Sequence, residues 1–204
     1  MLNFKPEQLT AKEKYKIMVG SVIPRPIALV SSQSDEGLVN IAPFSYFNLV
    51  TYRPPIVSVS VQRVEGEMKD TARNILKNHQ AVVHVVSQSN VEEANKTSAP
   101  LGPEESELDL TNFTLINSQV IDVPGVEESK VRFETELFNH VVIEENGIAT
   151  ADLLLLKVVH YSLDEHVYDV KTGYVDADTL APVSRLAGND YAKLGETFEL
   201  IRPT

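Results

Sequence analysis

A short segment around Lys69 combines a positive charge with the predicted start of a helix. Asp70 is a favourable N-cap residue, and apolar residues at helical spacing predict a helix over 70–79. The unpaired N–H groups and the dipole of a first helical turn attract anions, and Lys69 adds a full positive charge. With the hydroxyl of Thr71, this segment can hold a phosphate group. The same residues are typical of an ordinary capped surface helix, and local features alone favour that simpler interpretation because such helices are common.

A second segment, residues 40–48, gathers aromatic, hydroxyl and amide side chains around a proline. An isoalloxazine ring needs an apolar wall together with donors and acceptors for its pyrimidine edge, and this segment offers both. The alternative is an amphipathic strand that buries Phe44 and Phe47 in the core. The segment by itself does not decide between the two.

Two further groups have chemistry suited to a ligand site. Ser58 and Ser60 fall on one face of a predicted strand, where their hydroxyls can bind a ribityl chain or a phosphate, or can simply be solvated. Late in the chain, Arg185 and Tyr191 place a cation and a phenol near a glycine. An ordinary C-terminal turn is the simpler interpretation of that second group.

Several common catalytic and binding motifs are absent. The sequence has no G-x-G-x-x-G after a strand, no G-x-x-x-x-G-K-[ST], no H-E-x-x-H and no G-x-S-x-G. It has no cysteine, which excludes disulfides, thiolate metal sites and a cysteine nucleophile. The histidines are scattered, and the interval between His160 and His166 is no standard spacing for metal ligands. We therefore expect no metal site.

The chain is strongly acidic, with 18 lysines and arginines against 29 aspartates and glutamates and a net charge of −11. Such a chain is repelled by nucleic acids and anionic membranes, so neither is an expected partner. Its start has no apolar core of signal-peptide length, and no apolar run approaches the roughly 18 residues needed to span a membrane. We expect a soluble cytoplasmic protein.

Many short strand patterns and a few helical ones run through the 204 residues. A capping box of Thr10 and Glu13 predicts a helix over 10–19 that stops near Gly20. Asn146-Gly147 predicts a two-residue hairpin, and the apolar run Leu153–Leu156 predicts a strand buried on both faces. The remaining predictions are strands over 23–31 (beginning at a sheet edge or after Pro26), 38–47, 56–61, 81–87, 113–120, 131–143, 148–160 and 198–201, a helix over 90–98, an exposed acidic loop over 100–109, and irregular chain over 182–196.

These elements favour a single domain over residues 1–204 that is mostly β with some α, and plausibly a barrel. There is no internal repeat and no linker. The absence of a regular βαβα alternation counts against a Rossmann or flavodoxin architecture.

Taken in order, the segments resemble the flavin reductase-like FMN-binding proteins over roughly residues 15–195. The resemblance rests on residues 23–31, Gly37, residues 40–47, Pro54-Pro55, Lys69-Asp70-Thr71 with Asn74, and residues 182–188 with Tyr191. It implies a split β-barrel with Greek-key topology, usually a homodimer, with FMN held non-covalently near the subunit interface.

The resemblance also implies roles for individual residues. Phe44, Ser45, Tyr46 and Asn48 would lie along the isoalloxazine ring; Ser58, Val59 and Ser60 would approach the ribityl chain and phosphate; Lys69, Asp70 and Thr71, with Asn74 in the same motif, would hold the phosphate; Arg25 would add charge; and Arg185 and Tyr191 would close the pocket, in part from the partner chain. Three features depart from the family pattern: His84 where an asparagine is frequent, Leu153–Leu156 where a glycine is common, and the acidic loop 100–109. These departures affect the expected substrate more than the expected binding of FMN.

The function that the resemblance implies is an oxidoreductase in which NAD(P)H reduces bound FMN, and electrons pass to free flavin, a partner monooxygenase or another acceptor. Two alternatives stay open: a flavoredoxin-like electron carrier, and a flavin-binding module without turnover. Hydride transfer requires no side-chain acid or base, so no catalytic residue is assigned. His160 or His166 could lie near the open face of the flavin, although a structural histidine is the simpler interpretation.

Overall fold

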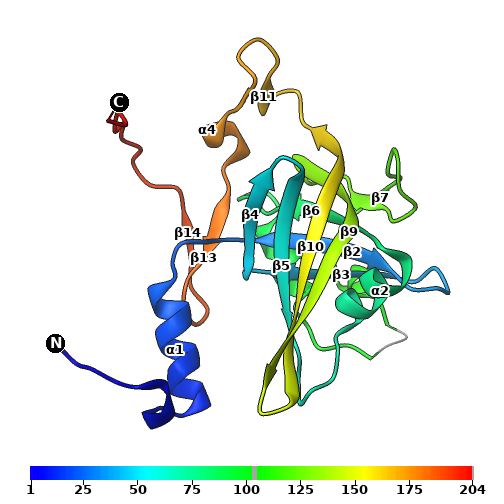
Figure 1. Ribbon diagram of the computed structural model, residues 1–204. Helices are drawn as coiled ribbons and strands as arrows, with labels where there is room; N and C mark the ends of the chain where they lie inside the picture. The colour runs from blue at the N-terminus through cyan, green and yellow to red at the C-terminus, as the bar shows by residue number, and fades with distance from the viewer. Residues whose placement is uncertain (103–104, 204) are drawn as a thin grey trace.

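The computed structural model describes residues 1–102 and 105–203 and is built mostly of strands (Figure 1). Its main element is a seven-stranded antiparallel sheet in the order β3-β2-β6-β9-β10-β5-β4. These strands are β2 (Ala28–Gln33), β3 (Val39–Phe44), β4 (Phe47–Tyr52), β5 (Pro55–Gln62), β6 (Gln80–Val85), β9 (Val131–Glu145) and β10 (Ile148–Leu163). The predominance of strands, with a few helices in the connections, confirms the predicted fold class.

The two outer strands of the sheet, β3 and β4, follow each other in the chain and are joined only by Ser45 and Tyr46. The sheet must therefore curl until its edges approach each other. Phe44 of β3 and Phe47 of β4 pack against the same buried core, and Ser60 in β5 donates its backbone N–H to the Tyr46 carbonyl at 2.9 Å. No ladder joins β3 to β4 in the described chain, so the curled sheet is a barrel that stays split at residues 45–46.

The inside of the barrel is apolar because its strands alternate inward and outward side chains. Helix α2 (Asp70–Asn78) closes one end of the barrel and buries Ala72 and Ile75 in the same core. The fully buried apolar side chains from β5 and β10 are Val59, Val61, Leu154 and Leu156. Burial of each such side chain contributes roughly 1.5–3 kcal/mol, so this core holds the curled sheet together.

A smaller sheet outside the barrel joins a segment from the first part of the chain to one from the last part. Its central strand β13 (Val183–Arg185) pairs with β1 (Arg25–Pro26) on one side and with β14 (Tyr191–Lys193) on the other, and helix α1 (Ala11–Ser21) lies beside this sheet (Figure 1). The other short elements are α3 (Val91–Lys96), α4 (Ala177–Leu180), 3-10 turns at Pro6–Gln8 and Glu107–Leu110, β7 (Leu115–Ile116) with β8 (Gly125–Val126), and β11 (Tyr168–Asp169) with β12 (Tyr174–Val175). None of the helices in the described residues is long and apolar enough to cross a membrane.

Local sequence signals are confirmed where they are strongest. In the capping box, Glu13 N–H donates to Thr10 Oγ1 at 3.3 Å, and Thr10 N–H donates to the Glu13 carboxylate at 2.8 Å. The helix ends at Ser21, one residue beyond Gly20, with its C-cap at Val22. Asn146 and Gly147 have φ values of 54° and 77°, the left-handed conformation that a tight hairpin between β9 and β10 requires.

Two predicted strands are longer than the strands in the structure, for different reasons. The strand expected over 38–47 is broken at residues 45–46, where the split of the barrel sends the chain from one edge to the other. The strand expected over 113–120 shrinks to β7. Its later backbone N–H groups, those of Gln119 and Val120, donate instead to the buried Glu134 carboxylate at 2.7 and 2.8 Å.

The C-terminal predictions are also corrected. Residues 182–196 were expected to be irregular, but they form the β13–β14 hairpin, whose Val183 is buried and donates its N–H to the Val86 carbonyl at 3.2 Å. Residues 198–201 form no strand. Phe198 is 81% exposed, and no strand in the described chain pairs with this segment.

The acidic loop over 100–109 is less exposed than expected, and Pro103 and Glu104 lie outside the described residues. Glu107 is half-buried, and its carboxylate accepts the backbone N–H of Ile41 at 3.2 Å. Burial raises the pKa of Glu107 despite this hydrogen bond. The loop is therefore partly anchored on β3.

Candidate functional site

A hollow of about 230 Å³ opens at the split of the barrel, between the barrel wall, α1 and the β13–β14 hairpin. It brings together seven of the fourteen residues proposed from the sequence, and these come from five separate segments of the chain. The seven are Arg25, Phe44, Ser45, Tyr46, Ser60, Lys69 and Arg185.

Arg25 is the buried corner of this hollow, with only 7% of its surface exposed. Its Nη1 donates to the carbonyls of Val19 and Val22 at 2.7 and 2.6 Å, and its Nη2 donates to the Leu186 carbonyl at 2.8 Å. The first two carbonyls lie at the C-terminal end of α1, where the helix dipole favours a cation. Arg25 thus ties α1 and the C-terminal segment to the barrel while it keeps its positive charge at the hollow.

Lys69 and Arg185 add two more cations. Lys69 is the N-cap residue of α2, and Asp70 is the first helical residue, which corrects the predicted N-cap by one position. The Arg185 guanidinium lies 4.5 Å from the centre of the Tyr191 ring and donates to the Gly188 carbonyl. Within residues 1–102 and 105–203, neither these two side chains nor Arg25 forms an ion pair.

Hydroxyl and phenol groups complete the lining. Ser45 Oγ accepts a long hydrogen bond of 3.4 Å from Arg25 Nε, and Ser60 Oγ accepts one of 3.2 Å from Gln62 Nε2. Burial and the nearby Tyr15 raise the pKa of the Tyr46 phenol, although the charge of Arg25 opposes this rise. Tyr46 therefore stays neutral, with a hydroxyl that can donate a hydrogen bond. Cations, hydroxyls and aromatic faces together fit an anionic ligand with a planar ring.

Three predicted residues point their side chains into the protein. Val59 is fully buried in the barrel core. Thr71 and Asn74 are 2% and 6% exposed: Thr71 Oγ1 accepts from Asn40 Nδ2 at 2.8 Å, and Asn74 Nδ2 donates to Ser32 Oγ at 3.3 Å. In this arrangement a ligand in the hollow would meet Val59 or Thr71 through the backbone, and their predicted roles stay predictions.

The other four predicted residues lie outside the hollow. Asp70 pairs with Arg73 on the surface of α2. Asn48 and Ser58 face each other across the β4–β5 ladder, with Ser58 Oγ 3.4 Å from the Asn48 carbonyl. Tyr191 donates its phenol O–H to Asn95 Oδ1 at 2.9 Å and lines a separate hollow beside α3. Direct contact with a ligand remains a prediction for each of them.

Some of the lining residues were not among those predicted from the sequence. Gln62 continues the outward alternation of Ser58 and Ser60 along β5, and that spacing could have predicted it. Tyr15 also lines the hollow but comes from α1, whereas Gly188, which belongs to the late segment noted in the sequence, comes from the turn of the β13–β14 hairpin. No local pattern signals that these distant segments meet at the barrel split.

The histidines lie elsewhere. His160 Nδ1 is 3.3 Å from the buried Glu134 carboxylate, at the edge of a different hollow, and His166 is exposed. In the part of the chain that the structure describes, no cluster of three or more histidines and carboxylates is placed to hold a metal ion.

Comparison with known proteins shows the family. The sequence model of the Flavin reductase like domain matches residues 19–178. The chain belongs to the flavin reductase-like family. This match confirms the predicted family, and it places the chain among flavin-binding oxidoreductases. Arg185 and Tyr191 lie beyond the matched region.

Solved structures agree with this assignment. Nitrilotriacetate monooxygenase component B from Bacillus cereus is 47% identical, with 98% of each chain covered and a TM-score of 0.95. The 2-nitrobenzoate 2-nitroreductase of Pseudomonas fluorescens is 30% identical, with 100% of this chain and 97% of that chain covered and a TM-score of 0.89. A flavin reductase with a split barrel domain from Shewanella frigidimarina is 19% identical over the whole of both chains, with a TM-score of 0.85. The last likeness concerns the fold alone and confirms the predicted split barrel.

Proposed function

We propose that this member of the flavin reductase-like family binds FMN at the split of the barrel, takes electrons from NAD(P)H and passes them to free flavin or to a partner oxygenase. The observation that carries the proposal is the convergence of Arg25, Lys69 and Arg185 on one hollow. The chain as a whole is acidic, with 29 acidic residues against 18 basic ones. Three cations that line one hollow and have no carboxylate partner among residues 1–102 and 105–203 repel one another, and an anionic ligand such as a phosphate removes that repulsion.

The residues in the hollow fit FMN. Lys69 and the N–H groups at the start of α2 suit the phosphate, and the hydroxyls of Ser45 and Ser60 suit the ribityl chain. Phe44 and Tyr46 offer aromatic faces for the ring. Once bound, FMN supplies the electron exchange, and the contribution of this chain is to bind the cofactor, orient it and exclude water from one side.

The proposed partner oxygenase is supported by the likeness to a protein named as component B of a monooxygenase. A component that reduces flavin for a separate oxygenase needs an accessible site and no oxygenase chemistry of its own. The hollow, which opens to the surface at the barrel split, is consistent with that role.

Purification with added FMN followed by rapid mixing tests the proposal. We expect a yellow protein whose flavin absorbance is bleached by NADH or NADPH in stopped-flow measurements, followed by reduction of added free flavin. If neither nucleotide bleaches the bound FMN but a reduced protein donor does, the protein is an electron carrier and the proposed reductase activity is wrong. A colourless protein that ignores added FMN would contradict FMN binding itself.

Lys69→Ala is expected to weaken FMN binding by about 1–2 kcal/mol, because it removes one charge-assisted contact to the phosphate. Fluorescence titration of the apoprotein with FMN measures the change. Lys77→Ala is the matched control, since Lys77 lies on the same helix but pairs with Asp35 in an exposed ion pair at 2.7 Å. Equal affinities of the two variants would place the phosphate away from Lys69.

We also propose that the protein is a homodimer, on the evidence of an apolar face outside the barrel. Leu154 and Leu156 are fully buried, but Leu153 and Leu155 are only half-buried, so the expectation of burial on both faces fails within one chain. Leu153 pairs with Ser60 and with Val141, which is 41% exposed. This apolar face therefore continues onto the lining of the hollow, and a second copy packed there would complete both burial and site.

Leu155→Asp is expected to convert the dimer into a monomer, because a carboxylate would then be buried without a partner at the interface. Light scattering after size-exclusion chromatography measures the mass of each species. Val170→Asp is the control, since Val170 is 82% exposed and lies between β11 and β12, which form a sheet separate from that of Leu155. A wild-type protein that elutes as a monomer would rule out the proposed dimer.

A further inference from the structure

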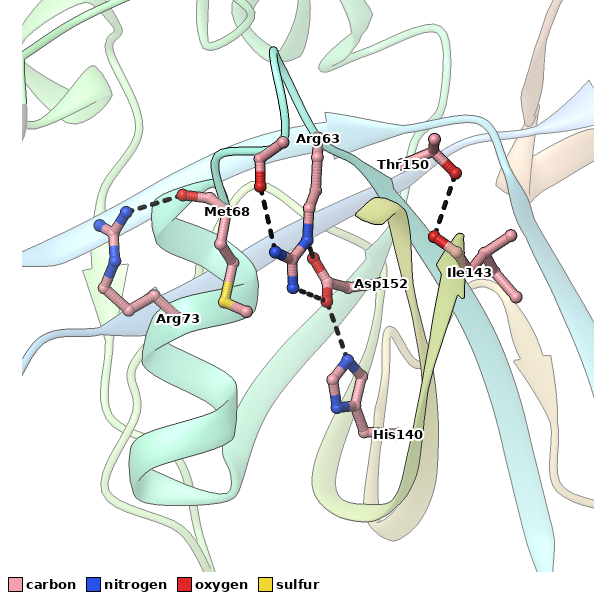
Figure 2. Close-up of polar contacts among 8 residues, drawn as sticks. Arg63, Met68, Arg73, His140, Ile143, Thr150 and Asp152 are labelled. Atoms are coloured by element: carbon pink, nitrogen blue, oxygen red, sulfur yellow. Dashed lines mark hydrogen bonds and ion pairs between the residues drawn. The ribbon is translucent and has the colours of Figure 1, made fainter. Parts of the chain in front are cut away.

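Two arginines, Arg63 and Arg73, hold the loop between β5 and α2, residues 63–69 (Figure 2). Neither arginine lines the hollow. The loop ends at Lys69, which is the N-cap of α2 and lines the hollow. Glu65 and Gly66 both have positive φ, at 52° and 84°, and Val64 pairs with Glu67 across the turn. The conformation of this turn therefore decides where Lys69 lies.

Arg63 holds the first half of the loop from inside the barrel. Its Nη1 donates to the Gly66 carbonyl at 3.1 Å. Its Nε and Nη2 donate to the two carboxylate oxygens of Asp152 at 2.9 and 2.8 Å, and that carboxylate is fully buried. His140 Nε2 lies 2.9 Å from the same carboxylate, as Figure 2 shows. Arg63 is thus fixed to β10, and through Gly66 it fixes the turn.

Arg73 holds the second half of the loop from the outside. Its Nη2 donates to the Met68 carbonyl at 2.7 Å (Figure 2). Its Nη1 pairs with the Asp70 carboxylate. Met68 directly precedes Lys69. Two guanidinium groups, one on each side, therefore clamp the carbonyls of Gly66 and Met68 just before the residue that carries the charge.

We infer that Arg63 and Arg73 are positioning residues for the flavin phosphate, and that they act through Lys69. This inference rests on the proposed function, in which Lys69 binds the phosphate. Neither arginine lines the hollow. Each can therefore affect the phosphate only by placing the loop, or by its charge at a distance.

Charge-conserving substitutions separate these two routes. Lysine keeps the positive charge in Arg63→Lys and Arg73→Lys, but a single ammonium group cannot hold a carboxylate and a carbonyl in the same planar geometry. A purely electrostatic effect would leave FMN affinity unchanged in both variants. A positioning effect would weaken it.

The experiment is a set of FMN titrations in the wild-type background and in the Lys69→Ala background, with thermal unfolding of each apoprotein. We expect the Kd for FMN to rise about tenfold in Arg63→Lys and about threefold in Arg73→Lys, the size of a partly lost charge-assisted contact. In the Lys69→Ala background the same substitutions should change the Kd by less than about twofold, because the residue they place is absent.

Arg132→Lys is the control for general loss of stability. Arg132 also donates to loop carbonyls, those of Val126 and Glu127 at 3.1 and 3.3 Å, but on another part of the barrel. It should lower the unfolding temperature without changing the Kd. Arg73 is on the surface, so Arg73→Lys should fold even where Arg63→Lys does not.

Three results would overturn the inference. If Lys69→Ala raises the Kd but neither arginine variant does, the loop is not positioned by these contacts and the proposed phosphate site stands. If the arginine and lysine effects simply add, the arginines do not act through Lys69. If Lys69→Ala itself has no effect, the proposed site fails, and this inference fails with it.

Discussion

Asp152→Ala is expected to lower the free energy of unfolding by about 3 kcal/mol, since removal of one partner leaves a buried charge uncompensated. Asp152 is fully buried, and the side chains of Arg63 and His140 that bind it are only 14% and 20% exposed. The substitution leaves the Arg63 guanidinium at the end of the barrel core without its carboxylate. Urea denaturation at neutral pH, followed by circular dichroism, measures the loss.

Asp35→Ala provides the matched control for Asp152→Ala. Asp35 also accepts from a cation, Lys77 at 2.7 Å, but both side chains are more than half exposed. Exposed pairs are worth roughly 0–1 kcal/mol, so this variant should be close to the wild type. If the two variants lose a similar free energy of unfolding, burial does not make the Asp152 pair more stabilising than the exposed pair.

His84 should make the fold lose about 3 kcal/mol of stability as the pH falls from 6.5 to 4, at about 1.4 kcal/mol for each pH unit. Burial lowers the pKa of His84 to about 4, although a hydrogen bond to the Leu29 carbonyl opposes the shift. Between pH 6.5 and 4, His84 binds a proton in the unfolded chain but stays neutral in the folded protein, so a lower pH favours unfolding. Above pH 6.5 both states hold a neutral ring and the full stability is present.

The hydrogen bonds of His84 explain why its ring stays neutral. Nδ1 lies 2.8 Å from the Leu29 carbonyl, which can only accept, so Nδ1 carries the proton. Nε2 accepts the backbone N–H of Val126 at 2.9 Å. A second proton on Nε2 would break that bond inside the core. The ring is thus a neutral bridge from β6 to β2 and β8.

His84→Asn removes the ionisable group and tests this prediction. The stability of the variant should fall less steeply than that of the wild type between pH 6.5 and 4, as measured by urea denaturation at several pH values. NMR of the His84 ring should show a midpoint well below 6.5. A midpoint near 6.5, or parallel pH profiles, would contradict the assignment.

Asp152 acts in a different pH window, which keeps the two predictions separable. Burial raises the pKa of Asp152, but the hydrogen bonds from Arg63 and His140 outweigh it, and the net pKa is lowered. A lowered carboxylate pKa contributes stability that is present above about 3.9 and is lost as the pH falls further. The slope between pH 4 and 6.5 therefore reports on His84 rather than on Asp152.

The sequence alone determined the features that depend on neighbouring residues. The capping box at Thr10, the Asn146-Gly147 hairpin and the alternation along β5 each involve side chains within a few positions of one another. Their geometry follows from local backbone chemistry, which any fold must respect. The cation at the start of α2 was predicted for the same reason, although its N-cap proved to be Lys69 itself.

Only the tertiary structure decided which distant residues meet. Arg25 and Leu186 are 161 residues apart, and Arg63 and Asp152 are 89 apart, yet each pair is joined by hydrogen bonds of 2.9 Å or less. The break at residues 45–46 and the short β7 likewise depend on partners far along the chain. These contacts are stabilised by burial and by charge pairing across the barrel. No pattern of neighbouring residues predicts them, because the partners are far apart in the sequence. Local chemistry therefore predicted Lys69 as a candidate ligand for phosphate, whereas Arg25 and Arg185, assigned to the pocket by the family resemblance, reach the same hollow only through the closure of the barrel.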